Sequence, residues 1–446
     1  MTQAIDLDSE RKRRKAEEEI DGLLRNPKSG NVLKTIANIE KIFSFHDAWR
    51  GMLVKDEFAE RILSVQDEAD GRVTPDIELG LWTDVSTTRA RIWLSKYFGL
   101  EVDVGTIDTV IDSIAYRNRR HPVRDYLNGL RWDATPRLPT MLNRYFGAEE
   151  SAYHSAIATM WMISGVARVF QPGCQADYML VLIGKQGIRK SSAIRVLAKQ
   201  WPADTLITIG DKDALQALHG IWIYEIAELS SIKSARDIER YKAFSTSRVD
   251  HYRQPYGRRF LDVPRQCIFA GTTNDDEPLT DAENRRAWVV DCGDIDLEGL
   301  QADVDQLWAE AYARYESKEP WYPTSAEIND ACREAQEQHT RIDAWQPIVE
   351  KWLRKSRNSF ETSPGNWSRF EDGVTAADAL TGAIGMPKER IDHYAASRMG
   401  RVLRDSGLEL KRESGKGRAR KYFKNDGWDE AEPTDDRLGS KWSLFE

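Results

Sequence analysis

The stretch YMLVLIGKQGIRKSSAIRVLAKQW, residues 178–201, decides the fold of the chain. It begins with an apolar run of strand length and ends with apolar residues at helical spacing. Between them, residues 184–191 match the phosphate-binding pattern GxxxxGK[ST], except that Arg189 stands in place of the second glycine. In such a loop the backbone N–H groups surround phosphates, the lysine neutralises them, and the hydroxyl binds Mg²⁺. The stretch predicts a site for ATP and Mg²⁺ made of Gly184, Gln186, Gly187, Arg189, Lys190, Ser191 and Ser192.

Arg189 leaves alternatives open. If its position requires a positive φ, an arginine there costs about 1–2 kcal/mol, which phosphate contacts can offset. If the position does not, the side chain points away from the loop. Neither alternative removes Lys190. A third is a degenerate loop that binds no nucleotide, which a measurement of ATP affinity decides.

Three later segments add residues for ATP hydrolysis. GIWIYEIAEL places Glu225 and Glu228 at the end of an apolar strand, where carboxylates can hold Mg²⁺ and polarise water; we expect Glu225 to share the metal with Ser191. RQCIFAGTTN ends another strand with Thr272, Thr273 and Asn274, which can orient the attacking water. Arg285 and Arg286 follow, and an arginine at a subunit boundary can reach a neighbour's γ-phosphate.

The order of elements indicates an α/β core between helical segments. Short apolar runs at 178–183, 220–226, 265–274 and 285–292 alternate with helix-like segments, which predicts a largely parallel sheet. We expect a helical extension over 1–44 and a mostly helical domain over 45–150. A P-loop (AAA+-like) ATPase core with its following helices should cover 151–345, and a linker with a C-terminal winged-helix-like domain 346–446.

Two basic segments are candidates for DNA contact. Residues 241–265 read as a β-hairpin turning at QPYG, with cations to follow a single strand's backbone and rings to stack on its bases. A basic loop paired with acidic neighbours is the alternative. The C-terminal helix–helix–ribbon pattern is also basic and can bind duplex DNA, or alternatively a protein. The candidate DNA-binding residues are Lys242, Arg248, His251, Tyr252, Arg253, Tyr256, Arg258, Arg259, Lys416, Arg418 and Arg420.

Bulk properties exclude several classes of protein. No segment approaches the run of roughly 18 apolar residues that a membrane span needs, and the N-terminus lacks a signal-peptide core, so we expect a cytoplasmic protein without a membrane partner. The four cysteines contain no CxxC pair, which gives neither a zinc site nor a disulfide framework any support. The net charge of −8 argues against indiscriminate coating of nucleic acid.

The sequence resembles a known family. The runs HPVRDYLNGLRWD (121–133), PGCQADYMLVLIGKQGIRKSS (172–192), YKAFSTSRVDHYRQPYGRRFLDVPRQCIFAGTTND (241–275) and ENRRAWVV (283–290) resemble the virulence-associated E family of phages and mobile islands. This family is similar to superfamily 3 replicative helicases. The resemblance covers about residues 45–355.

The resemblance implies a ring-forming ATPase, usually a hexamer, that moves along single-stranded DNA. Lys190 and Ser191 then belong to the phosphate loop, Glu225 and Glu228 to the acidic motif, Asn274 to the sensor and Arg285 or Arg286 to the arginine finger. The glutamates are separated by two residues instead of being adjacent, so which one is the catalytic base stays open. The competing hypothesis is a DNA-binding regulator whose nucleotide state switches its assembly.

Overall fold

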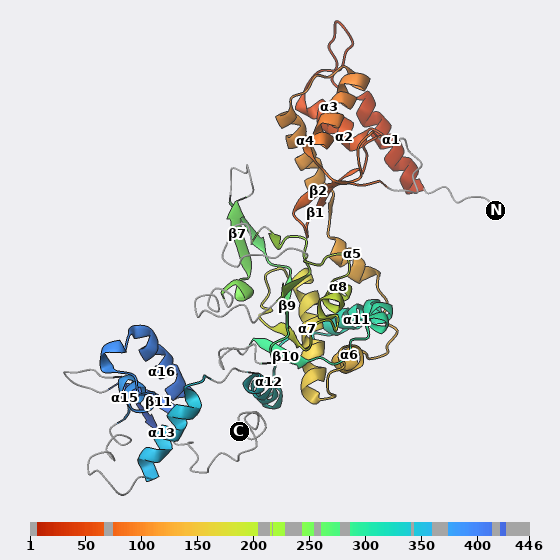
Figure 1. The fold of residues 1–446 in the computed structure, drawn as a ribbon. Helices are drawn as coiled ribbons and strands as arrows, with labels where there is room; N and C mark the ends of the chain where they lie inside the picture. Colours follow the sequence, from red (N-terminus) through yellow and green to blue (C-terminus); the bar gives the residue numbers. More distant parts are fainter. Residues whose placement is uncertain are drawn as a thin grey trace. The chain divides into compact units, whose positions relative to one another are not determined.

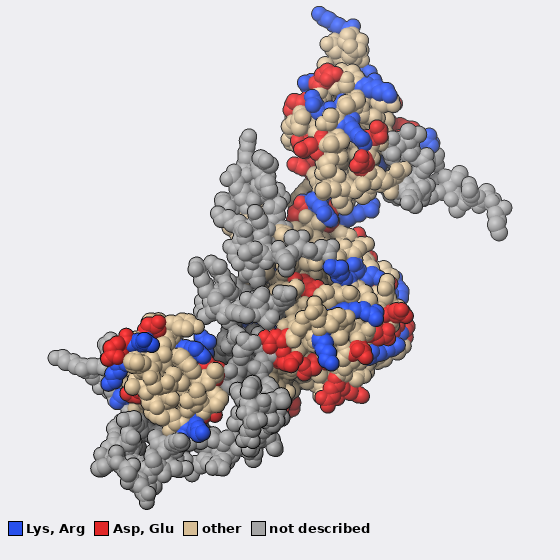
Figure 2. Space-filling model, in the orientation of Figure 1, with Lys and Arg blue, Asp and Glu red and all other residues tan. Residues whose placement is uncertain are grey.

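The structure is a computed structural model, and the chain divides into two compact units, Met1–Thr340 and Arg341–Glu446 (Figure 1). Among the helices of the described ranges, none has the length and apolar character that crossing a membrane requires. Basic and acidic side chains are interspersed over the visible faces (Figure 2). The ranges described are 7–66, 75–203, 215, 217–227, 243–253, 260–276, 286–339, 343–358, 373–412 and 420–424.

The N-terminal part of the first unit combines helices with a small sheet that the sequence did not predict. The sheet has the order β3-β2-β1-β4, in which β1 is antiparallel to β2 and parallel to β4. Leu23, Ile39 and Phe43 share one core with Trp49 and residues as far as 114, so residues 23–43 pack within this domain and are not a separate extension. The elements are α1 (Leu7–Asp21), α2 (Ile36–Phe45), β1 (Leu53–Asp56), β2 (Arg61–Ser64), β3 (Gly80–Leu81), α3 (Asp84–Phe98), α4 (Val104–Arg117) and β4 (Arg119–Arg120).

A four-stranded parallel sheet forms the centre of the first unit, as the sequence predicted. Its order is β10-β5-β9-β6, and each neighbouring pair is parallel. Because the strands run in one direction, their carboxyl ends lie at one edge of the sheet. The strands are β5 (Met179–Ile183), β6 (Ile223–Ala227), β9 (Ile268–Thr273) and β10 (Ala287–Asp291).

Both faces of this sheet are buried, which explains its continuous apolar runs. Along β5, Leu180 and Leu182 join the core that includes helices α7, α8 and α11, while Val181 belongs to the opposite cluster. Trp222 stacks on Trp308 of α11 with ring centroids 3.9 Å apart. The covering helices are α7 (Ala152–Phe170), α8 (Lys190–Ala198), α11 (Leu297–Glu316) and, packed against β10, α12 (Ala326–Gln338) (Figure 1).

Residues 122–146 pack against the sheet's own helices and not with the N-terminal helices. The apolar sides of α5 (Pro122–Gly129), η2 (Leu138–Thr140) and α6 (Met141–Phe146) lie in the same core as α7 and α11. The boundary predicted at residue 150 therefore moves to the junction between β4, which ends at Arg120, and α5, which begins at Pro122. The reason is physical: these short helices have no core of their own and cover the sheet domain instead.

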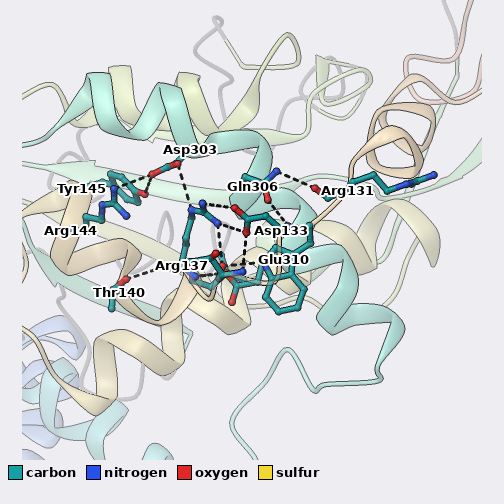
Figure 3. A network of polar contacts seen from close by, with 12 residues as sticks. Arg131, Asp133, Arg137, Thr140, Arg144, Tyr145, Asp303, Gln306 and Glu310 are labelled. Atoms are coloured by element: carbon teal, nitrogen blue, oxygen red, sulfur yellow. Dashed lines mark hydrogen bonds and ion pairs between the residues drawn. The ribbon is translucent and has the colours of Figure 1, made fainter.

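A polar network fixes this segment on α11 (Figure 3). Glu310 is fully buried, and its carboxylate accepts the backbone N–H groups of Arg137 and Leu138 at 2.5 and 2.9 Å. The Tyr145 hydroxyl donates to Asp303 at 2.6 Å. Each of these acceptors lies on α11, so this network ties the segment to helix α11.

The second unit has its own core, built from helices and a two-stranded ribbon. Leu353, Leu380, Met399 and Leu403 belong to this core. The predicted helix, helix and ribbon are present, and β11 and β12 pair antiparallel from Leu408–Lys424 to Arg412–Arg420. The elements are α13 (Gln346–Asn358), α15 (Ala376–Gly382), η4 (Lys388–Arg390), α16 (His393–Asp405), β11 (Leu408–Arg412) and β12 (Arg420–Lys424).

Candidate functional site

The predicted phosphate loop joins β5 to α8 at the carboxyl edge of the sheet. Gly184, Gly187 and Arg189 have positive φ values of 151°, 88° and 70°. A Cβ on Gly184 would lie 2.9 Å from the carbonyl oxygen of Cys292, so this position requires glycine. Gln186 is exposed, and Ser191 and Ser192 lie in the first turn of α8. The loop residues that the sequence selected are therefore all in one loop and the following helical turn.

Arg189 adopts the left-handed conformation in which a glycine is expected. Its φ of 70° and ψ of 29° decide between the two readings of the sequence: the position does require a positive φ. The side chain is exposed. The arginine therefore carries backbone strain at the N-cap of α8.

Lys190 is buried and fully engaged with neighbouring oxygens. Only 7% of the residue is exposed, and burial lowers the pKa of its ammonium group. Its Nζ donates to the carbonyl oxygens of Gly184 and Lys185 at 2.6 and 2.9 Å, and to Oδ1 of Asn274 at 3.0 Å. Asn274 follows β9, so two residues 84 positions apart meet at the sheet edge.

Glu225 is the centre of a second group of contacts at the same edge. Its Oε1 accepts from the Ser191 hydroxyl at 2.6 Å and from the Thr272 hydroxyl at 2.8 Å. Ala227 is the register partner of Thr272, which puts Glu225 and Thr272 on one face of neighbouring strands. The Thr272 hydroxyl holds the carboxylate, a contact that the strand pairing reveals, and its role in orienting water stays a prediction.

Few of the described side chains at this edge of the sheet supply the oxygen atoms that Mg²⁺ prefers as ligands. Ser191 and Glu225 supply a hydroxyl and a carboxylate, the types that Mg²⁺ prefers. Over the described ranges, no group of three or more His, Cys, Asp or Glu residues is placed to hold a metal ion. A magnesium ion at this edge therefore depends on phosphate oxygens or water for its other ligands.

Arg286 lies at the opposite edge of the sheet. It precedes β10, and its carbonyl oxygen accepts from the N–H of Met179, the first residue of β5. The length of β5 thus separates Arg286 from the phosphate loop of its own chain. Glu228 and Arg285 fall outside the described residues.

The predicted hairpin is present as β7 (Val249–Arg253) and β8 (Phe260–Pro264), paired antiparallel. Its base is fixed to the core, because buried Arg265 forms an ion pair with buried Asp250 and Arg248 Nε donates to the carbonyl oxygen of Gly173 at 2.8 Å. Lys242 lies outside the described residues. So does the hairpin tip, which contains Tyr256, Arg258 and Arg259.

One of the predicted hairpin contacts needs correction. Tyr252 is 6% exposed and packs edge-on against His219, so its ring faces the interior and is not presented for base stacking. Arg248 is exposed, and its Nε also forms a bond that fixes the hairpin base. His251 is exposed and contacts Asp262 across the strands, while Arg253 ends β7. In a β-strand, successive side chains point to opposite faces of the sheet. The sequence of the hairpin did not show which of its two faces is buried.

The ribbon of the second unit carries part of the predicted basic set. Arg420 begins β12, and Lys416 and Arg418 lie outside the described residues. Arg398, part of the same basic segment, donates to both carboxylate oxygens of Asp343 at 2.8 Å and lies over the ring of Trp345 at 3.8 Å. The guanidinium of Arg398 is therefore used inside the unit.

Comparisons with known proteins match part of the chain, residues 127–341, to a family. A comparison with curated proteins finds no match. Among solved structures, the apo NrS-1 C-terminal region (305–718) has 11% identity and a TM-score of 0.46, covering 84% of this chain and 96% of that chain. Its A form has 12% identity and a TM-score of 0.38, covering 67% and 77%. Likenesses at these scores carry no argument about function. The family model of the virulence-associated protein E-like domain matches residues 127–341. These residues are a virulence-associated protein E-like domain, the family that the motifs of the sequence resemble.

Proposed function

We propose that the chain is an ATP-dependent DNA helicase or replication initiator of a phage or mobile element. In this proposal it works as a ring, with a hexamer expected, and moves along single-stranded DNA. One observation carries the proposal: at the carboxyl edge of a parallel sheet, Lys190 bonds to Asn274 and its neighbour Ser191 bonds to Glu225, although the partners are far away in the sequence.

The residues of this edge fit a magnesium nucleotide. The loop 184–189 has the positive φ values that turn backbone N–H groups inward, and α8 begins directly after it. A Cβ on Gly187 would meet nothing within 4 Å, which leaves room at the loop for a phosphate group. Lys190 supplies a buried positive charge, and Ser191 with Glu225 supplies two oxygens for Mg²⁺.

Each side chain then has a defined task. Bound Mg-ATP supplies the phosphoanhydride bond and the charge that the site must stabilise. Lys190 would offer its ammonium group to phosphate oxygens in place of the loop carbonyls, and Ser191 would offer its hydroxyl to the metal. Glu225 accepts a proton from water, or holds the metal through water. Thr272 remains as the donor that keeps the Glu225 carboxylate in place after Ser191 has turned away.

Arg286 fits a role in a neighbouring subunit. Since it lies at the amino edge of the sheet, it reaches the phosphate loop of another copy and not that of its own chain. An arginine supplied between subunits makes hydrolysis depend on assembly. This supports a ring, and the hairpin β7–β8, rigid at its base, is the element we assign to the single strand inside it.

The test is an ATPase and unwinding assay with and without single-stranded DNA. We expect DNA-stimulated hydrolysis in the wild type and its loss in Lys190→Ala. Lys185→Ala, which removes an exposed lysine of the same loop, is the matched control and should keep the activity. Equal activity of wild type and Lys190→Ala would refute the proposal.

A mixing experiment tests the arrangement of subunits. Arg286→Ala and Lys190→Ala proteins should each be inactive, and their mixture should regain part of the activity, because some interfaces then pair an intact loop with an intact arginine. If the mixture stays inactive, Arg286 does not act between subunits. Nucleotide-dependent ring formation without strand displacement would favour the regulator instead.

A further inference from the structure

One face of α16 carries a line of exposed polar and basic residues. Tyr394, Ser397, Arg401 and Arg404 are exposed, with Tyr394 at 75%, and they follow the spacing of one helical stripe. The opposite side of the helix enters the core of the second unit through Ala395, Met399, Val402 and Leu403. We call the exposed stripe the α16 face. Tyrosine and arginine are among the residues that proteins most often use to anchor a partner.

The α16 face is held in a fixed orientation. Arg398, beside the stripe, is bound to Asp343 and Trp345, which links α16 to the residues preceding α13. On the other side, a Cβ on Gly400 would lie 2.4 Å from the Tyr422 hydroxyl, so the glycine allows β12 of the ribbon to approach the helix closely. Because the helix is fixed at both sides, binding a partner to the α16 face loses little additional conformational entropy.

We propose that the α16 face binds duplex DNA in the major groove. A helix about 10–12 Å across fits a groove about 12 Å wide. Arg401 and Arg404 lie three residues apart, a rise of about 4.5 Å, which suits neighbouring base pairs spaced about 3.4 Å along the strand. Guanidinium groups bind guanine edges or phosphates in bidentate fashion, and the tyrosine and serine contact bases or backbone.

Other elements of the unit support a duplex over a single strand. α15 packs against α16, and in a helix-turn-helix the second of two packed helices lies in the groove. Exposed Lys388 and Arg390 lie in η4, just before α16, and exposed Lys411 lies in β11, just after it, so the segments next to the face in sequence also carry cations for phosphates. A single strand would require exposed aromatic rings in series, whereas the face offers one, Tyr394.

This inference is independent of the proposed ATPase. The α16 face belongs to the second compact unit, and Lys190 and Glu225 belong to the first. Duplex binding is therefore expected without nucleotide and in the Lys190→Ala variant. Loss of ATPase activity and loss of duplex binding are separate results.

The experiment measures binding of the full chain, without nucleotide, to a labelled duplex of mixed sequence and to one labelled strand of it. Arg401→Ala/Arg404→Ala should weaken duplex binding about ten- to a hundredfold. Its binding to the single strand should match that of the control variant. The control is Arg13→Ala/Arg333→Ala, which removes the same charge from exposed helix positions in the first unit.

A second variant keeps the test decisive if the alanine pair fails to fold. Arg401→Lys/Arg404→Lys keeps both charges but not the bidentate fork, so its loss of duplex affinity should lie between those of the alanine pair and the control. Duplex affinity equal to that of the control in both variants overturns the proposal and assigns the face to an acidic protein partner. Equal losses for duplex and single strand also overturn it.

Discussion

Replacing Arg189 by glycine should stabilise the protein. The residue has a φ of 70° and a ψ of 29°, a conformation that costs a non-glycine residue about 1–2 kcal/mol. Glycine removes this cost but loses about 0.4–1 kcal/mol through the greater freedom of the unfolded chain. The net gain in the free energy of unfolding is therefore about 0–1.6 kcal/mol, with a central value of about 0.8 kcal/mol. Because Arg189 belongs to the unit Met1–Thr340, the central value corresponds to a rise in Tm of at most about 3 °C.

Urea unfolding at equilibrium, followed by fluorescence and circular dichroism, measures the change. Arg189→Ala is the first control, because alanine keeps the positive φ and should stay close to the wild type. Arg195→Gly, at an exposed helical position of α8, is the second and should destabilise by about 1 kcal/mol. Together they separate relief of strain from loss of the arginine side chain.

The reasoning fails if Arg189→Gly is no more stable than Arg189→Ala. Repeating the measurement with saturating Mg-ATP adds a second result, since a ligand that binds the folded state stabilises it according to its affinity. Weaker stabilisation of Arg189→Gly by Mg-ATP would show that the arginine takes part in binding phosphate. Equal stabilisation would show that the strain serves no purpose in the bound state.

Three further predictions concern contacts described above. Asp250→Asn leaves the buried guanidinium of Arg265 without a counter-charge and should lower the free energy of unfolding by about 3–5 kcal/mol in urea titrations, and Asp250→Leu/Arg265→Met should cost less. The hydrogen bond to a carboxylate of β10 raises the pKa of His339 above 6.5, so its stabilisation is fully present below that pH and is lost as pH rises through the raised pKa. His339→Gln should therefore cost about 0.2–1 kcal/mol near pH 6 and less at alkaline pH, measured by urea unfolding across pH. Thr272→Val should lower kcat for ATP about tenfold with little change in KM, whereas Thr272→Ser should keep the rate, because only the hydroxyl orients Glu225.

Each of these has an outcome that contradicts it. If Asp250→Asn is as stable as the wild type, the guanidinium of Arg265 has found another partner. A cost of His339→Gln that does not change with pH means that the ring contributes through packing and not charge. For Thr272, the same loss in the serine variant would identify a packing defect.

The sequence predicted the central sheet because its signal is local. Apolar runs of strand length ending in Glu225 or in Thr272, Thr273 and Asn274 read as buried parallel strands, and each is found in the sheet. The small N-terminal sheet gave no such signal, since its strands have two to four residues and lie between stronger helical patterns. Short strands take their stability from packing, which a single sequence does not display.

Side-chain partners were harder to predict than elements. Arg248 is an exposed cation that also fixes the hairpin base, and Arg398 is held by Asp343; the sequence indicated neither contact. The side chain of Tyr252 is on the buried face of β7, and which face of this strand is buried depends on the elements that pack against it. The location of Arg286 could have been found, because a residue that precedes a parallel strand lies at the amino edge, away from the loop after β5.

The hydrogen bonds of Lys190 and Glu225 within the protein have a consequence for turnover. Both groups already have partners, so a ligand at this edge replaces bonds and does not simply add them. Binding by exchange returns less free energy than binding to unsatisfied groups, and release costs correspondingly less. An enzyme that must discharge its product in every cycle gains speed from such a site at the expense of affinity.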